Sequence, residues 1–130
     1  GAVTLPAGDA PVSWITRKDI AAFTVDVLLD ANTTSVALNL TAETPRSFPS
    51  ILHAVAARTG VAIDYREPDD ESYRAMLLGF GIDEGTALIF SQVCRAMREG
   101  AVSASDSAFR DRLGRPAESV DAFLERTFAA

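Results

Sequence analysis

Apolar residues recur at helical spacing in six stretches of the chain, and nearly every stretch is bounded by residues that can begin and end a helix. The helices that this pattern predicts cover about 17–30, 47–60, 69–79, 83–100, 105–114 and 119–128. The first of them is apolar on nearly its whole circumference, so we expect it to be buried on most sides.

Other stretches have the alternation that is typical of strands. Between Ser35 and Thr41, Val36, Leu38 and Leu40 alternate with smaller or polar residues, which predicts a strand with one apolar face. Residues 61–65 predict a second short strand, and the first fifteen residues have the character of strands and turns. The expected fold class is α+β, with five or six helices around a few short strands in a single domain over residues 1–130.

Charge and composition narrow the class of protein. The net charge of −6 disfavours nucleic acid and anionic membranes as partners, because both bind clustered positive charge. No apolar run approaches the roughly 18 residues that a membrane-spanning helix needs. Cys94 is the only cysteine, which excludes an internal disulfide. Eleven arginines against one lysine are typical of a GC-rich bacterial gene, and we expect a cytoplasmic protein.

Asp19 and His53 are the residues whose type or position first suggests chemistry. Asp19 follows Thr16 at the spacing of a capping box, so we interpret its carboxylate as a stabiliser of the helix start, worth about 0.5–2 kcal/mol. His53 is the only histidine. It lies off the apolar stripe of its helix, with no nucleophile or carboxylate at helical spacing other than Ser50, and a surface or capping role is expected.

Cys94 and the acidic run 69–71 are interpreted as structural. Cys94 lies on an apolar helix, where a thiol packs as a small hydrophobe, although Arg95 and Arg98 could lower its pKa. The acidic run complements the dipole of a helix start and lacks the ligand spacing of a calcium loop. One histidine and one cysteine do not make a zinc or iron site, so no metal is expected.

Aromatic residues and one methionine are the candidates for a small-molecule pocket. Tyr73, Met76 or Leu77, and Phe80 fall on one face of a predicted helix. Rings that carry a polar group are common in pockets for flat molecules, whereas simple core packing is the alternative. The predicted substrate contacts are Trp14, Tyr65, Tyr73, Met76 and Phe80.

Several short motifs, taken in order, carry a resemblance to a known family. They are WITRKDIA at 14–21, LNLT at 38–41, AARTG at 56–60, SYRAML at 72–77 with Gly81 beyond, LGRP at 113–116 and VDAF at 120–123. Each motif is weak by itself, but their order and spacing cover essentially the whole chain. The chain resembles the C-terminal part of the NmrA-like family of atypical short-chain dehydrogenases, in particular the NAD(P)H-dependent quinone and dye reductases.

The resemblance implies a part that covers the cofactor crevice and shapes a pocket for an aromatic or quinone-like substrate. In the family, the preceding half supplies the Gly-rich turn that holds the pyrophosphate. Nothing in this chain matches G-x-G-x-x-G, since Gly79-Phe80-Gly81 follows a predicted helix and is a helix-stop signal. NAD(P)H is therefore implied for the full architecture, this chain alone is expected to bind no cofactor, and no catalytic residue can be assigned.

Three functions stay open at this point. The chain is the substrate-binding half of a reductase, a stand-alone small-molecule binder or non-redox isomerase or cyclase, or a regulatory module. Its abrupt start suggests a piece of a longer protein. Because the helix 17–30 and the strand 35–41 need cover, we expect a homodimer or a dinucleotide-binding partner domain, besides a small-molecule ligand.

Overall fold

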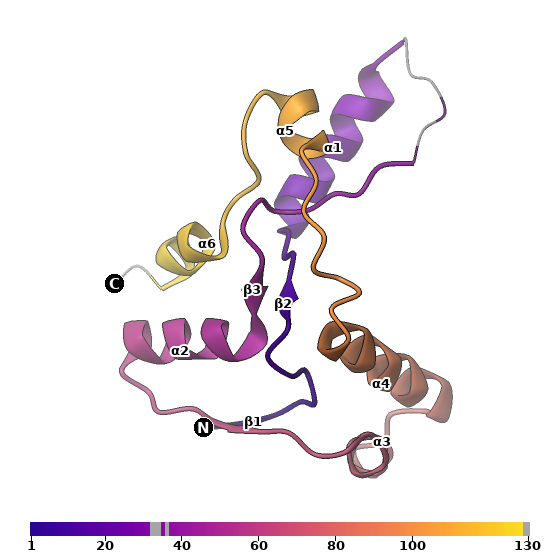
Figure 1. The fold of residues 1–130 in the computed structure, drawn as a ribbon, viewed down its shortest axis with the longest axis vertical. Helices are drawn as coiled ribbons and strands as arrows, with labels where there is room; N and C mark the ends of the chain where they lie inside the picture. The colour runs from indigo at the N-terminus through magenta and orange to yellow at the C-terminus, as the bar shows by residue number, and fades with distance from the viewer. Residues whose placement is uncertain (32–34, 36, 129–130) are drawn as a thin grey trace. The chain divides into compact units, whose positions relative to one another are not determined.

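The computed structural model describes residues 1–31, 35 and 37–128. Over these residues it contains six helices and four short strands, which confirms the α+β class (Figure 1). In chain order they are β1 (Ala2–Thr4), β2 (Pro11–Val12), α1 (Arg17–Leu29), β3 (Arg46–Ser47), α2 (Phe48–Thr59), β4 (Asp64–Arg66), α3 (Asp70–Gly79), α4 (Glu84–Arg98), α5 (Ala108–Leu113) and α6 (Val120–Thr127). No helix in this part of the chain is long and apolar enough to cross a membrane.

Local capping explains why the helix boundaries were predictable. In five helices the residue before the first turn accepts a hydrogen bond from a backbone N–H three positions later; these residues are Thr16, Ser47, Asp69, Asp83 and Ser119. At the other end, α2 and α5 stop at Gly60 and Gly114, whose φ values of 67° and 66° lie in the left-handed region that favours glycine. The signals that set these ends are therefore encoded within a few residues of each end.

The chain divides into two compact units, Gly1–Val12 with Arg46–Ser103 and Ser13–Pro45 with Ala104–Ala130. We call them unit 1 and unit 2. The prediction of a single domain stays a prediction.

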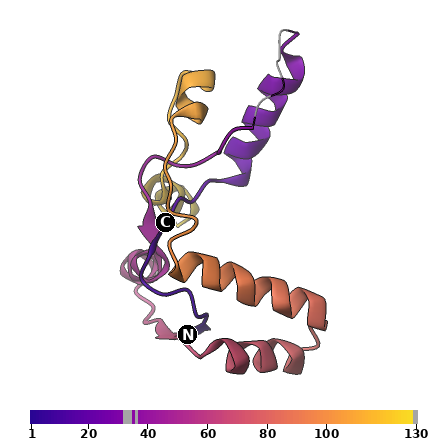
Figure 2. The same cartoon turned by 45° about the vertical axis from the view of Figure 1, so that its right-hand side comes forward.

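Unit 1 combines the four short strands with α2, α3 and α4. β1 pairs with β4 in parallel, with Val3 opposite Tyr65, and β2 pairs with β3 antiparallel. α3 and α4 form a helical hairpin and lie side by side (Figure 2). The buried residues of this hairpin are Tyr73 on α3 and Ala87, Ser91, Cys94 and Met97 on α4. They recur every three or four positions along α4, which is why one stripe of that helix faces its neighbours.

Unit 2 has a core of its own around two phenylalanines. Phe23 on α1 stacks with Phe109 on α5 at 6.0 Å between ring centroids. Ala42 and Ala117 complete the buried cluster, and Ile15, Val27, Leu40 and Leu113 pack against it. α1 is thus packed against α5 on one side.

Two expectations about unit 2 are wrong. The described residues 35 and 37–41 form no strand, while Val36 lies outside the described residues. A strand needs a hydrogen-bonded neighbour, and all four described strands belong to unit 1. α1 is also not buried on most sides, because only Asp19 and Phe23 are buried, and Leu28 and Leu29 are 78% and 80% exposed.

Smaller differences concern element ends in unit 1 and unit 2. The strand predicted at 61–65 is found at Asp64–Arg66, and no strand continues past Val12 into residues 13–15. The helix expected from Ser105 begins at Ala108, with no side-chain cap on its first turn. Such shifts arise because strand and short-helix ends depend on contacts outside the local sequence.

Candidate functional site

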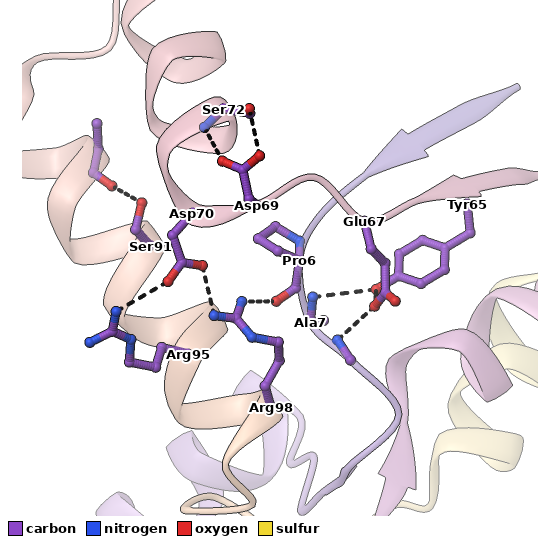
Figure 3. A network of polar contacts seen from close by, with 12 residues as sticks. Pro6, Ala7, Tyr65, Glu67, Asp69, Asp70, Ser72, Ser91, Arg95 and Arg98 are labelled. Carbon is purple, nitrogen blue, oxygen red and sulfur yellow. Dashed lines mark hydrogen bonds and ion pairs between the residues drawn. The ribbon is translucent and has the colours of Figure 1, made fainter.

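A hollow lies at the carboxyl ends of the two parallel strands, β1 and β4, in unit 1 (Figure 3). Its volume is about 450 Å³, and it is lined by Pro6, Glu67, Pro68, Asp69, Asp70 and Arg98. Ligands of α/β folds bind outside the carboxyl ends of parallel strands, because the loops that follow the strands diverge there. We call this hollow the strand-end hollow and take it as the candidate site.

Arg98 joins two walls of the strand-end hollow. Its Nη1 donates to the Pro6 carbonyl at 2.5 Å, and its Nη2 donates to Asp70 Oδ1 at 2.7 Å (Figure 3). Arg95, one turn earlier on α4, contacts the other Asp70 oxygen at 3.3 Å. The hydrogen bond from Arg98 is the main reason that the pKa of Asp70 lies below its usual value. The carboxylate of Asp70 is therefore ionised at neutral pH and held in place.

Tyr65 and Glu67 hold the turn that follows β1. The Tyr65 hydroxyl lies 2.8 Å from the Leu5 carbonyl and 2.7 Å from Glu67 Oε1, and it accepts a hydrogen bond from the Ala7 N–H at 3.3 Å. Glu67 Oε1 also accepts the Gly8 N–H at 2.8 Å. Burial, reinforced by the hydrogen bond to Glu67, raises the pKa of Tyr65. Tyr65 therefore stays protonated and braces the turn.

Asp69 completes the wall as the N-cap of α3. Its carboxylate accepts the Ser72 N–H at 2.7 Å and the Ser72 hydroxyl at 2.9 Å, and these bonds lower the pKa of Asp69. The lining consists of carboxylates, prolines and one guanidinium, without a serine, cysteine, histidine or tyrosine. Such a lining can bind and orient a molecule by hydrogen bonds and charge, and among the described residues it presents no hydroxyl, thiol or imidazole.

A second hollow lies between α3 and α4 and shares Asp70 with the first. Its volume is about 360 Å³, and it is lined by Asp70, Glu71, Arg74, Leu88, Ser91, Gln92 and Arg95. Arg74 pairs with Glu84 through Nη2, while its Nε is buried without a hydrogen-bond partner. The Ser91 hydroxyl donates to the Ala87 carbonyl at 3.0 Å, within its own helix.

Asp19 in unit 2 has a larger structural role than the capping box predicted. Thr16 does cap α1, since its Oγ1 accepts the Asp19 N–H at 3.1 Å. Asp19 is 2% exposed. Its carboxylate accepts one hydrogen bond from the Arg115 guanidinium at 2.9 Å and another from the Glu118 N–H at 2.7 Å. Burial opposes its ionisation, but the bonds from Glu118, Arg115 and Thr16 outweigh burial and lower the pKa of Asp19.

The structure places the predicted substrate residues as follows. Tyr73, Met76 and Phe80 follow one another along α3 and its C-cap: Tyr73 is buried, Met76 is half-buried, and Phe80 is 75% exposed. Tyr65 lies on β4 of the same unit and Trp14, half-buried, in unit 2. None of the five lines the hollows described above. Their role in binding stays a prediction.

The residues interpreted as structural are found in structural positions. His53 is exposed on α2, and Cys94 is buried on α4, where burial raises the pKa of its thiol. The part of the chain that the structure describes holds no group of three or more histidines, cysteines or carboxylates placed to bind a metal.

The sequence did not single out Arg98 and Glu67 as site residues. In the sequence, Arg98 bears only on the pKa of Cys94, and Asp69 and Asp70 belong to an acidic run at a helix start that lacks the ligand spacing of a calcium loop. The available signal was positional, since residues 5–8 and 67–70 each follow directly after a strand that proved to be parallel. The pairing of β1 with β4 joins residues about sixty positions apart, and no local sequence pattern indicates it.

No family model matches the chain. A curated relative, Prestalk A differentiation protein A of Dictyostelium discoideum, is 24% identical over 129 residues, which are 99% of this chain and 43% of that protein. The chain therefore spans less than half the length of this relative.

Three solved structures share the fold. The triphenylmethane reductase of Citrobacter sp., complexed with NADP(H), is 20% identical with a TM-score of 0.83, over 97% of this chain and 44% of that one. The NADPH-dependent quinone oxidoreductase of Escherichia coli, complexed with NADPH, is 18% identical with a TM-score of 0.87, over 98% and 45%. A nucleoside-diphosphate-sugar epimerase of Staphylococcus aureus is 18% identical with a TM-score of 0.81, over 95% and 43%. The chain therefore has the fold of the corresponding part of these proteins, which confirms its resemblance to the C-terminal part of NmrA-like reductases at the level of the fold.

Proposed function

We propose that this chain is the substrate-side part of an NAD(P)H-dependent reductase for flat aromatic or quinone-like molecules, and that it does not hold the nucleotide by itself. The observation that carries the proposal is the match to the quinone oxidoreductase complexed with NADPH. That match takes in 98% of this chain at a TM-score of 0.87 but only 45% of the oxidoreductase. More than half of such a protein has no counterpart in this chain, and in our proposal the nucleotide-binding part belongs to that remainder.

The junctions between strands and helices in unit 1 support the proposal that the other part binds the nucleotide. A pyrophosphate binds at a helix N-terminus that is preceded by a glycine-rich turn, because free N–H groups and the helix dipole attract it. The junction between β4 and α3 instead carries Glu67, Asp69 and Asp70, whose negative charges would repel a phosphate. The junction between β3 and α2 places Pro49 in the first turn, which removes one N–H donor.

The strand-end hollow supports a substrate-side role. It provides charged walls that orient a ligand, and Tyr65 braces one of these walls from β4. The exposed Phe80 offers a ring face at the end of α3, which suits stacking on a planar substrate. In this proposal the predicted substrate residues of unit 1, Tyr65, Tyr73, Met76 and Phe80, contribute to the substrate pocket of the assembled protein, and the hydride comes from NAD(P)H bound by the other part.

One feature of unit 2 supports a docking surface for that other part. On α1, Leu28, Leu29 and Val25 turn apolar side chains to solvent along the side opposite Phe23. Exposed apolar faces of this kind are sites of contact with another domain, and in this proposal the dinucleotide-binding domain covers this one. A second copy of this chain is the competing occupant.

A non-redox isomerase is the second candidate. The structural neighbour named as a nucleoside-diphosphate-sugar epimerase shares the fold at a TM-score of 0.81, so this fold also occurs in a protein named for isomerisation. The two candidates differ in one measurable respect, because an isomerase consumes no stoichiometric NAD(P)H.

The test follows NADPH absorbance with a naphthoquinone or a triphenylmethane dye as acceptor. This chain alone, the nucleotide-binding part alone, and both together, as one polypeptide or as two, are compared at equal concentrations. The proposal predicts turnover only when both are present. Oxidation of NADPH by this chain alone, or none by the assembled protein with either acceptor, would contradict it. Conversion of a nucleotide sugar without loss of NADPH would establish the isomerase instead.

A further inference from the structure

The turn after β1 approaches the last turn of α4 closely at Gly8 and Arg98. Gly8 has a φ of +65°, which other residues adopt at a cost. A Cβ at this position would lie 2.8 Å from Arg98 Cγ. The contact is with the stem of the arginine, close to the backbone of α4, so a larger residue at position 8 would displace the whole side chain.

Beyond this contact the guanidinium of Arg98 spans the strand-end hollow. Its two terminal nitrogens reach the Pro6 carbonyl at 2.5 Å and Asp70 Oδ1 at 2.7 Å (Figure 3). The guanidinium is planar and presents its donors at fixed angles, so it holds its two acceptors at a defined separation. One acceptor belongs to the turn after β1 and the other to the first turn of α3.

The other hydrogen bonds around the hollow act within one wall or along β4. Tyr65 and Glu67 hold the turn 5–8 from β4 and the residue after it, and Asp69 closes the N-terminus of α3 on Ser72. Among the hydrogen bonds of the described residues, those of Arg98 join the turn directly to α3.

We infer that Arg98 is a positioning residue that sets the separation between the turn 5–8 and the N-terminus of α3, and that glycine at position 8 leaves room for the arginine side chain. Arg98 acts through the Pro6 carbonyl and Asp70 and touches no reacting atom. Arg95 is a matched comparison, because it lies one turn earlier on α4 and also contacts Asp70. Unlike Arg98, it makes no hydrogen bond to Pro6 among the described residues.

The direct test measures backbone amide exchange at Ala7 and Gly8 in the wild type, Arg98→Met, Arg98→Lys and Arg95→Met. Loss of a charge-assisted bond to the turn should raise exchange in Arg98→Met by about tenfold or more. Arg98→Lys should rise less, and Arg95→Met should match the wild type. Unchanged protection in Arg98→Met, or an equal loss in Arg95→Met, would overturn the inference.

Gly8→Ala is the second variant, for the case that Arg98→Met does not fold. It keeps the charge of the arginine and displaces its stem, so exchange at Ala7 should rise while the net charge stays the same. Wild-type protection at Ala7 in Gly8→Ala would contradict the close-approach argument.

A kinetic measurement extends the test and rests on the proposed function. In the assembled reductase, Arg98→Met should raise the KM for the quinone or dye by about tenfold with a smaller change in kcat, and Arg98→Lys should restore part of it. A fall in kcat with unchanged KM would contradict the positioning role. Absence of turnover in the wild type would refute the proposed function, while amide exchange would still decide the role of Arg98.

Discussion

Asp19 and Arg115 lie 96 positions apart in the sequence, and Oδ1 of the aspartate is 2.9 Å from Nη2 of the arginine. The second oxygen of Asp19 accepts the Glu118 N–H at 2.7 Å. The buried carboxylate thus ties the start of α1 to the segment between α5 and α6. The local sequence indicates only a helix cap at Asp19, but in the structure this residue also holds two distant segments of unit 2 together.

Replacement of Asp19 by alanine should therefore cost more than the loss of a cap. A cap partner is worth about 1 kcal/mol, whereas loss of a buried carboxylate that accepts charge-assisted and backbone bonds costs about 2–4 kcal/mol. Urea denaturation measures the free energy of unfolding. Asp111→Asn, at an exposed carboxylate on α5, is the control and should stay near the wild type. A loss of less than about 1 kcal/mol in the free energy of unfolding of Asp19→Ala would mean that Asp19 acts only as a helix cap.

The stability should also depend on pH through Asp19. Its pKa is lower in the folded chain than the ordinary value of about 3.9, so ionised Asp19 adds stability that is fully present above that value. The contribution is lost as the pH falls through the folded-state pKa. The difference in melting temperature between wild type and Asp19→Asn should be constant from about pH 7 to 5 and shrink below about pH 4. A difference that does not change down to pH 3 would rule out this linkage.

The sequence predicted what short-range signals determine. Ser47 and Gly60 bound α2 because a hydroxyl reaches a nearby N–H and glycine accepts a left-handed φ, both within a few residues. The strand at 35–41 was wrong because alternation describes a face, while pairing needs a neighbour that the described part of unit 2 does not contain. In the candidate site, Arg98 and Pro6 are 92 positions apart, and no local pattern indicates that contact.

Tyr73 and Phe80 should separate stability from binding, although they lie seven positions apart along the same helix. Tyr73 is buried, so Tyr73→Ala should cost about 3–5 kcal/mol, as large-to-small changes in a core do. Phe80 is mostly exposed, so Phe80→Ala should change the free energy of unfolding by less than about 0.5 kcal/mol. If Phe80 contributes to the pocket, calorimetric titration with a naphthoquinone should show weaker binding to Phe80→Ala in the assembled protein. Equal affinity would remove Phe80 from the predicted site.

The exposed face of α1 should drive association. Leu28→Lys places a cation near the C-terminus of the helix, where the dipole favours it, so the fold should be retained. Light scattering should report a dimer or larger species for the wild-type chain at micromolar concentration and a smaller species for Leu28→Lys. Lys18→Glu, in the first turn of the same helix, is the control and should associate like the wild type. A wild-type chain that stays monomeric would contradict this prediction, because the exposed apolar face of α1 would then be stable in water without a partner.

Calorimetric titration of NADPH into the purified 130-residue chain tests the division of labour most directly. We expect no saturable binding, because the strand-to-helix junction at 67–70 presents carboxylates, which repel a pyrophosphate. The same titration into the assembled protein should show binding with one nucleotide per chain. A micromolar Kd for the chain alone would contradict the account, since this part would then hold the nucleotide that we assign to the other.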